Sequence, residues 1–295
     1  MDGARCRRCG ADAETFLDRL IANHVPRRIG GIVLTHLLNE RGTVEAEVTC
    51  ARLGDEPFYL MFAAFHGLRV LDWLNRHRER NEWVSTNVVS EDYGCLVLSG
   101  PRSRDVLRRV TQAPLDNAGF PWLRAQGINV AGVEVRALRM SYVGELGWEL
   151  HVPMAELATV YDALWQAGEE YGIGNFGSYA LNAMRLEKGF KGASELTNEV
   201  TLPEADVMRF VKLDKGDFVG RAPTIESLEG PLPWICAISP SIPRSLTVTA
   251  ARRCWRTGAP SVPSAPGRSA IAWERAWPSH TSPRSWPHRT RSSRS

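Results

Sequence analysis

Three side chains that could do chemistry lie close together in the stretch LRMSYVGELGWELHV, residues 138–152: Tyr142, Glu145 and Glu149. Apolar residues alternate on both sides of Gly144–Gly147, and this pattern predicts two strands joined by a short loop, a β-hairpin. A carboxylate held on a strand can accept paired N–H bonds from a flat amidine-like edge, which pterin and guanine rings present. Glu149 is therefore a candidate ligand for such a ring. The alternative is a solvated strand glutamate.

The rest of the chain alternates between helical and strand patterns. Helices are expected at 12–23 (with Asp12 as N-cap), 66–77, 102–110, 154–171 and 178–188, and strands at 32–38, 43–53, 58–64, 83–89, 94–98, 128–130 and 133–140. In the helix at 66–77, Leu68, Leu71 and Leu74 lie along one face, with Val70 and Trp73 beside them. Because several strand pairs look like hairpins, we expect an α+β fold with antiparallel sheets and not a doubly wound parallel sheet.

Residues 172–177 spell GxGxxG, the pattern of a dinucleotide-binding loop. Such a loop needs a strand before it and a helix opening inside it, whereas a helix precedes this one. We therefore reject a dinucleotide site and expect these glycines to end one helix and start a short strand.

Composition indicates a soluble globular protein, with 43% hydrophobic and 23% charged residues. Neither an apolar run long enough to cross a membrane nor a secretory signal is present, and the six cysteines are scattered, so we expect a cytoplasmic protein with reduced thiols. Cys6 and Cys9 have CxxC spacing, but no second pair follows to complete a zinc site.

The C-terminal residues 239–295 differ from the rest of the chain. They hold twelve Ser, ten Arg, eight Pro and four Trp but one Glu and no Lys or Asp. This composition argues against packed elements. We interpret 229–295 as a basic tail that is disordered or translated out of frame, and rank a nucleic-acid-binding arm last.

Five blocks in the remaining sequence carry a family resemblance: THLLNERGTVEAEVTCARL, YGCLVLSGPRSRDVL, SYVGELGWELHVP, NAMRLEKGFKGASELTNEVTLPEAD and KLDKGDFVGR. In this order they resemble the folate-binding half of dimethylglycine and sarcosine dehydrogenases. That half is similar to the aminomethyltransferase (T-protein) of the glycine cleavage system. The resemblance covers roughly residues 10–228, leaving residues 1–9 as an irregular N-terminus.

The resemblance implies two α+β lobes and a third C-terminal β-barrel around a cleft for tetrahydrofolate. The barrel should begin near residues 231–235, where the tail replaces it. The family's N-terminal FAD domain has no counterpart, so FAD would belong to a missing domain or to a separate oxidoreductase subunit. We expect the chain to be a middle piece of a larger enzyme.

The resemblance also assigns roles to four residues. Glu149 matches the glutamate that clamps the pterin ring, and Tyr142 matches a tyrosine that lines the same pocket. Glu47 matches a carboxylate, usually Asp, near the reacting folate nitrogens. A folate-contacting Arg is replaced by Leu181, whereas Arg185 in the RLEKG motif is retained as a cofactor-binding or structural residue.

The implied reaction is capture of an N-methyl amine-derived iminium by tetrahydrofolate, giving 5,10-methylenetetrahydrofolate and a demethylated amine. The protein must align the two reactants and accept a proton, and a carboxylate such as Glu47 suits both tasks. Two alternatives remain. One is a non-catalytic folate-binding protein of the iron–sulfur-cluster maintenance type, which carries a KGC[YF] motif where this chain reads Lys188–Lys191 without Cys. The other is an inactive fragment.

Overall fold

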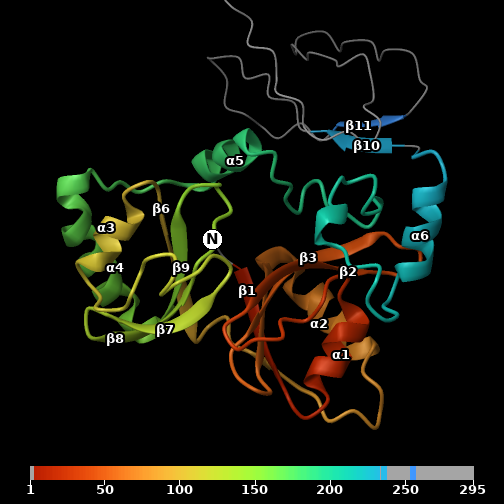
Figure 1. The fold of residues 1–295 in the computed structure, drawn as a ribbon, viewed down its shortest axis with the longest axis horizontal. Helices are drawn as coiled ribbons and strands as arrows, with labels where there is room; N and C mark the ends of the chain where they lie inside the picture. The colour runs from red at the N-terminus through yellow and green to blue at the C-terminus, as the bar shows by residue number, and fades with distance from the viewer. Residues whose placement is uncertain (1–2, 233, 238–252, 257–295) are drawn as a thin grey trace, which may run out of the picture.

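Two lobes lie side by side in the computed structural model, which describes residues 3–232, 234–237 and 253–256 (Figure 1). Each lobe is an antiparallel sheet with two helices packed against one face. The predicted α+β fold with antiparallel sheets is confirmed.

The first sheet has five strands in the order β2-β3-β4-β1-β5. Its strands are β1 (Gly3–Cys9), β2 (Ile32–Leu38), β3 (Val44–Arg52), β4 (Phe58–Ala63) and β5 (Ser85–Val88). β1 corrects the expectation of an irregular N-terminus, since this segment pairs antiparallel with both β4 and β5. Its arginines and cysteines show no apolar alternation, so only the neighbouring strands specify it as a strand.

Two helices cover one face of this sheet, α1 (Ala13–Leu20) and α2 (Gly67–Arg76), the latter entered through the 3-10 turn η1 (Ala64–His66). The buried residues of α2 are Val70, Trp73 and Leu74, and Leu71 packs against the same core. Leu68, expected on the same face as Leu71 and Leu74, is instead 86% exposed. Positions two residues apart on a helix lie roughly 200° apart, which turns Leu68 away when Val70 faces the sheet.

The second sheet has the order β6-β9-β8-β7. Its strands are β6 (Tyr93–Ser99), β7 (Ala125–Val130), β8 (Val133–Leu138) and β9 (Gly147–Pro153). Its helices are α3 (Ser103–Arg108) and α4 (Leu157–Gly168). The 3-10 turns η2 (Met154–Glu156) and η3 (Glu169–Tyr171) lie at the two ends of α4. The predicted hairpin is present, but its loop spans 139–146. The loop is longer than predicted because the backbone of Arg139 bonds to Leu123 and Arg124 instead of to β9.

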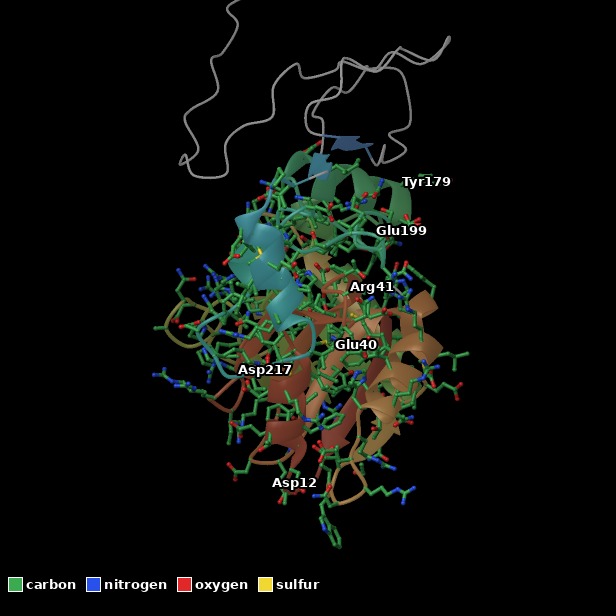
Figure 2. All side chains as sticks on the ribbon, turned by 90° about the vertical axis from the view of Figure 1, so that its right-hand side faces the viewer. Asp12, Glu40, Arg41, Tyr179, Glu199 and Asp217 are labelled. Carbon is green, nitrogen blue, oxygen red and sulfur yellow. The ribbon has the colours of Figure 1, made fainter. Side chains whose placement is uncertain are left out.

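The segment after α4 runs back toward the first lobe. It contains α5 (Ser178–Glu187), η4 (Met208–Phe210) and α6 (Arg221–Glu229). Residues 172–177 form a loop that leads directly into α5, so the short strand expected there is wrong. α5 lies at one end of the molecule, where Tyr179 projects with 78% of its surface exposed (Figures 1 and 2).

Beyond α6, β10 (Trp234–Ala237) and β11 (Arg253–Arg256) pair as an antiparallel ribbon. This ribbon differs from the expectation of a tail without regular elements. The predictions made for residues 238–252 and 257–295 lie outside the described residues. In the part of the chain that the structure describes, no helix has the length and apolar character needed to cross a membrane.

The inner faces of the two sheets, opposite their helices, pack against each other. The shared core contains Ile32, Ala51, Tyr59, Met61, Val89, Ala125 and Leu138. Backbone hydrogen bonds also join the lobes: Gly30 N–H donates to Arg52 O at 2.7 Å, and Ala125 N–H donates to Gly30 O at 2.7 Å. The lobes therefore form one structure whose inner faces are held in register.

Candidate functional site

Both predicted carboxylates lie on the inner faces. On β3, Ala46 and Val48 pack toward α1 and α2, so Glu47 between them points to the opposite face. On β9, Trp148 and Leu150 pack toward α3 and α4, and Glu149 between them likewise points inward. Strand alternation alone thus directs Glu47 and Glu149 toward the space between the sheets.

Glu47 is paired with a buried histidine. His36 lies directly opposite Glu47 in the β2–β3 register, and its Nε2 is 3.5 Å from Glu47 Oε2. His36 is fully buried, and neither of its ring nitrogens has a hydrogen-bond partner among the described residues. Buried polar atoms are nearly always satisfied, so an unsatisfied imidazole beside a carboxylate marks a place where a polar ligand would fit.

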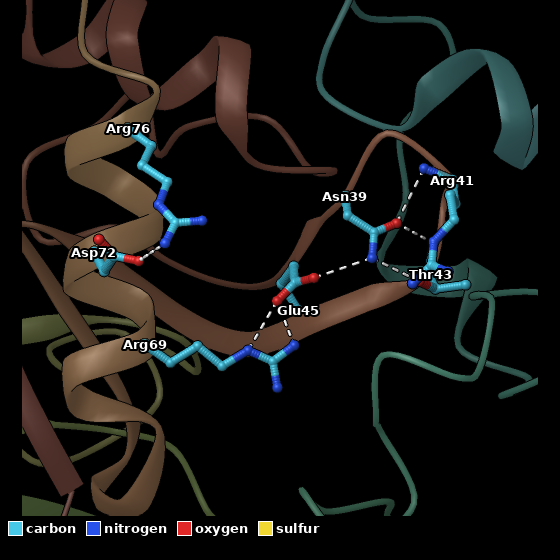
Figure 3. A network of polar contacts seen from close by, with 7 residues as sticks. All are labelled: Asn39, Arg41, Thr43, Glu45, Arg69, Asp72 and Arg76. Atoms are coloured by element: carbon cyan, nitrogen blue, oxygen red, sulfur yellow. Dashed lines mark hydrogen bonds and ion pairs between the residues drawn. The ribbon is translucent and has the colours of Figure 1, made fainter.

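The turn before β3 fixes the strand that carries Glu47 (Figure 3). Asn39 Oδ1 accepts the N–H groups of Arg41 at 3.0 Å and Thr43 at 3.2 Å. Asn39 Nδ2 donates to Glu45 Oε1 at 3.0 Å, and Glu45 Oε2 accepts Arg69 Nε of α2 at 2.8 Å. This network anchors β3 two residues before Glu47.

Tyr142, in the loop between β8 and β9, reaches the same region. Its hydroxyl donates to Lys191 O at 3.5 Å. Burial, aided by the charges of Glu47 and Glu195 and opposed by Arg185, raises the pKa of Tyr142 to about 12. Tyr142 therefore stays protonated at neutral pH and can donate a hydrogen bond.

Arg185 on α5 is occupied by its own chain. Its guanidinium donates to Glu195 Oε2 at 2.8 Å and Glu195 Oε1 at 3.2 Å, and also to Asn182 Oδ1 and Phe190 O. Arg185 is 3% exposed and Glu195 2%. With four of its five N–H donors used, Arg185 acts as a structural brace that organises the segment 185–195 beside Tyr142.

Glu195 is the carboxylate that forms the ion pair with Arg185. Burial opposes its ionisation, but hydrogen bonds from Arg185, the Gly192 N–H and Ser194 outweigh burial, so the pKa of Glu195 lies below its ordinary value. A Cβ placed on Gly192 would lie 2.4 Å from Tyr142 Oη and 3.4 Å from Arg185 Cζ. Because Gly192 has no side chain, the Tyr142 hydroxyl and the Arg185 guanidinium can both lie close to its backbone.

Glu149 has a different set of neighbours. Its Oε2 lies 3.6 Å from His151 Nε2 on the same face of β9. His151 is 1% exposed, and its Nδ1 is 3.2 Å from the hydroxyl of Tyr59 on β4. The carboxylate of Glu149 is thus held at the seam between the lobes, with 14% of its side chain exposed.

The structure brings Tyr142 into electrostatic reach of Glu47 and Arg185, whereas Glu149 forms an ion pair with His151. Sequence reasoning missed His36, His151, Tyr59 and Glu195. His151 could have been found from its position two residues after Glu149 on one strand face. Glu195 lies in an irregular segment without periodicity, so no sequence signal identifies it.

A cavity of about 600 Å³ lies elsewhere, along the edge strand β6 and the loop 172–177. Among the described residues that line it, Arg102 is the one charged side chain, and none of Glu47, Tyr142 or Glu149 contributes. We place the candidate site at the inner faces, because that is where paired ionisable groups and unsatisfied polar atoms lie.

The architecture and inner-face carboxylates define a two-lobed antiparallel α+β protein with a polar seam between its lobes. The chain belongs to the GCVT N-terminal domain family, whose model matches residues 4–215.

Known relatives agree with this assignment. The chain is 38% identical over 215 residues to the mitochondrial dimethylglycine dehydrogenase of Mus musculus, covering 72% of this chain and 25% of that protein. It is 29% identical over 222 residues to an aminomethyltransferase of a Thermoanaerobacter species, covering 75% of this chain and 60% of that protein. The chain therefore spans about a quarter of the length of the curated dehydrogenase relatives.

A solved structure shares the fold. The glycine cleavage system aminomethyltransferase T from Bartonella henselae superimposes with a TM-score of 0.70 at 21% identity, covering 79% of this chain and 63% of that chain. The family resemblance predicted from the five sequence blocks is confirmed.

Proposed function

We propose that the chain binds tetrahydrofolate at the seam between its two sheets and takes part in methylene transfer, as the folate-binding part of a dimethylglycine or sarcosine dehydrogenase-like protein. The observation that carries this proposal is that Glu47 lies 3.5 Å from the buried imidazole of His36, whose ring nitrogens have no hydrogen-bond partner among the described residues, and within electrostatic reach of Tyr142. The oxidising step and its FAD are assigned to sequence outside this chain or to a partner.

The residues present fit a folate. A pterin ring offers N–H donors on its amidine edge and acceptors on its other edges. The side chains at the seam include hydrogen-bond acceptors for the first and donors for the second. Glu149 supplies a carboxylate for the donors. The Tyr142 hydroxyl supplies a donor by exchanging its long bond to Lys191 O, 3.5 Å, for one to the ring. The Ser141 hydroxyl is buried and has no hydrogen-bond partner among the described residues, so it can join the same ligand.

Tetrahydrofolate, when bound, supplies the nitrogen nucleophile that captures the one-carbon unit. The protein has two tasks. Glu149 holds the ring in one orientation, and Glu47 stabilises positive charge at the reacting nitrogen and accepts its proton. His36, 3.5 Å from Glu47, keeps the carboxylate oriented across the strand pair.

Binding is tested by calorimetric titration with folinic acid, a stable tetrahydrofolate derivative. Glu149→Ala removes a charged acceptor and should weaken binding about 10–100-fold. Glu134→Ala is the matched control, because Glu134 is exposed on the neighbouring strand β8 and bonds to Asn129. A folded wild type that does not bind, or equal affinity in Glu149→Ala, would refute the proposal.

Glu47→Gln tests the transfer step. It keeps the side-chain shape but cannot accept the proton, so methylene transfer should fall about 10²–10⁴-fold while folinic acid affinity is retained. A separate FAD oxidoreductase that oxidises sarcosine supplies the iminium in this assay. Glu40→Gln, on the exposed turn before β3, should leave the rate unchanged (Figure 2). Equal loss of binding and transfer in Glu47→Gln would mean that Glu47 is a folate ligand instead.

A non-catalytic folate-binding protein remains the second candidate function. It shares the binding prediction and differs in the transfer assay, where wild type and Glu47→Gln would both be inactive.

A further inference from the structure

A second kind of site lies at the seam and includes Glu149 itself. Cys95 on β6 is the direct cross-strand neighbour of His151, and Glu149 precedes His151 by two residues on β9. All three side chains share the inner face of the second sheet. One ligand atom from each, a thiol sulfur, an imidazole nitrogen and a carboxylate oxygen, lies within 4.8 Å of the other two.

We propose that Cys95, Glu149 and His151 form a binding site for a borderline-soft divalent cation, with Zn²⁺ as the fitting ion. Sulfur, imidazole and carboxylate are the donors that Zn²⁺ takes, and three protein ligands with one open position is the pattern of an accessible zinc site. Mg²⁺ and Ca²⁺ prefer oxygen donors alone and would bind poorly here.

The distances are close to those of a filled site. Tetrahedral zinc with ordinary bond lengths places its nitrogen and oxygen ligands about 3.3 Å apart and its sulfur and nitrogen ligands about 3.6 Å apart. His151 Nε2 lies 3.6 Å from Glu149 Oε2 and 4.0 Å from Cys95 Sγ. The two pairs that include His151 are therefore within a few tenths of an ångström of bonding geometry. The ligand atoms of Cys95 and Glu149 lie within 4.8 Å of each other, so these two side chains close the remaining distance by rotating about their side-chain torsions.

An outer partner fixes the imidazole for this role. The hydroxyl of Tyr59 lies 3.2 Å from His151 Nδ1. A metal-binding histidine usually donates its second ring N–H to such an acceptor, which leaves the other nitrogen free to bind the ion. Donation from Nδ1 to Tyr59 places the lone pair on Nε2, the nitrogen that faces Glu149 and Cys95.

A neighbouring cation is held by other groups, and an entry path exists. Arg136 is opposite His151 on β8, but its guanidinium donates to the Tyr93 hydroxyl at 2.7 Å and lies 4.1 Å from the Tyr93 ring centroid. Cys95 is half-buried and lines the cavity of about 600 Å³ along β6. An ion can therefore approach from the cysteine side, and binding releases the thiol proton to solvent.

The test uses the full chain, stripped of metal by a chelator, without folate. Zn²⁺ is titrated against a chromophoric indicator, and Co²⁺ is added separately as a spectroscopic probe. We expect one tight ion per chain and a thiolate-to-cobalt charge-transfer band. Cys95→Ser should abolish the band, and both Cys95→Ser and Glu149→Gln should lose more than the roughly 10–100-fold in affinity that an outer partner contributes.

Two further variants test whether Zn²⁺ binding depends on the three proposed ligands. Tyr59→Phe removes only the outer partner, so it should weaken Zn²⁺ binding about 10–100-fold and keep the cobalt band. The double variant Cys6→Ser with Cys9→Ser should bind as wild type does. A wild type without the band, or a Cys95→Ser variant that binds Zn²⁺ like wild type while its circular dichroism is native, would overturn the proposal. Since no folate is present, this failure is independent of the proposed function.

Discussion

At the scale of single residues, the Arg185–Glu195 pair is the most consequential contact described. Both side chains are almost fully buried, and the carboxylate also accepts the Gly192 N–H at 2.7 Å and the Ser194 hydroxyl at 2.8 Å. Removing one partner of a buried ion pair is strongly destabilising, because the other charge then stays buried and unpaired. The pair keeps the segment beside Tyr142 in place.

Arg185→Met should therefore lower the free energy of unfolding by about 3–5 kcal/mol, measured by urea denaturation. Arg76→Met is the matched control. Arg76 pairs with Asp72 at 2.5 Å on the surface of α2, with side chains 75% and 58% exposed (Figure 3). That loss should stay below about 1 kcal/mol. Similar losses in both variants would show that the buried pair is not a brace.

At the scale of elements, α1 depends on a lysine distant in sequence. Lys215 is 6% exposed, and its ammonium donates to the carbonyls of Ile21 and Asn23, each at 2.9 Å, and to Asp18 O. Burial, opposed by Asp18, lowers the pKa of Lys215. The last carbonyls of a helix lack intrahelical partners, and a cation there satisfies them.

Lys215→Met should cost about 2–4 kcal/mol of stability, because it leaves buried carbonyls without a donor. Hydrogen exchange should rise first in α1 and in the segment 212–219, which bonds to it through Lys212 N–H and Val219 N–H. Lys212→Met, at an exposed side chain three residues before Lys215, should change neither measurement. Unaltered exchange in α1 of Lys215→Met would contradict the role of this lysine.

The elements were largely predictable where one face is apolar. β3 follows from alternation, β2 and β4 follow from short apolar runs beside turn residues, and α4 follows from its apolar stripe. α2 was placed correctly except for Leu68, because Leu68 is as apolar as Val70 and only the sheet decides which of them is buried. β1 was missed because its pairing partners, β4 and β5, are distant in sequence.

The candidate site was predictable in part for the same reason. Glu149 and Glu47 follow from strand position and family resemblance. Contacts such as His36 with Glu47 and Tyr59 with His151 exist only after strands and lobes have packed. No sequence pattern identifies the residues that form these contacts.

At the scale of the whole molecule, the lobes are joined by a glycine. Gly30 has φ +78°, and its backbone bonds link Arg52 of the first lobe to Ala125 of the second. A Cβ at position 30 would lie 2.6 Å from Ala125 O. Any other residue would therefore strain the backbone and separate the hydrogen-bonded segments.

Gly30→Ala should lower stability by about 1–3 kcal/mol and weaken folinic acid binding, because the ligand spans the seam. Gly127→Ala, where an added Cβ meets nothing within 4 Å, should leave both unchanged. Calorimetry and urea denaturation on the same preparations give both quantities. Normal folate affinity in a destabilised Gly30→Ala would place the ligand away from the seam.

The most direct test of the account is a crystal structure of the chain with folinic acid. We predict that the amidine edge of the pterin faces the Glu149 carboxylate, with Tyr142 against the ring and Glu47 near the reacting nitrogens. A ring bound in the cavity along β6, or bound without contact to Glu149, would contradict the central claim that the seam between the two sheets is the folate site.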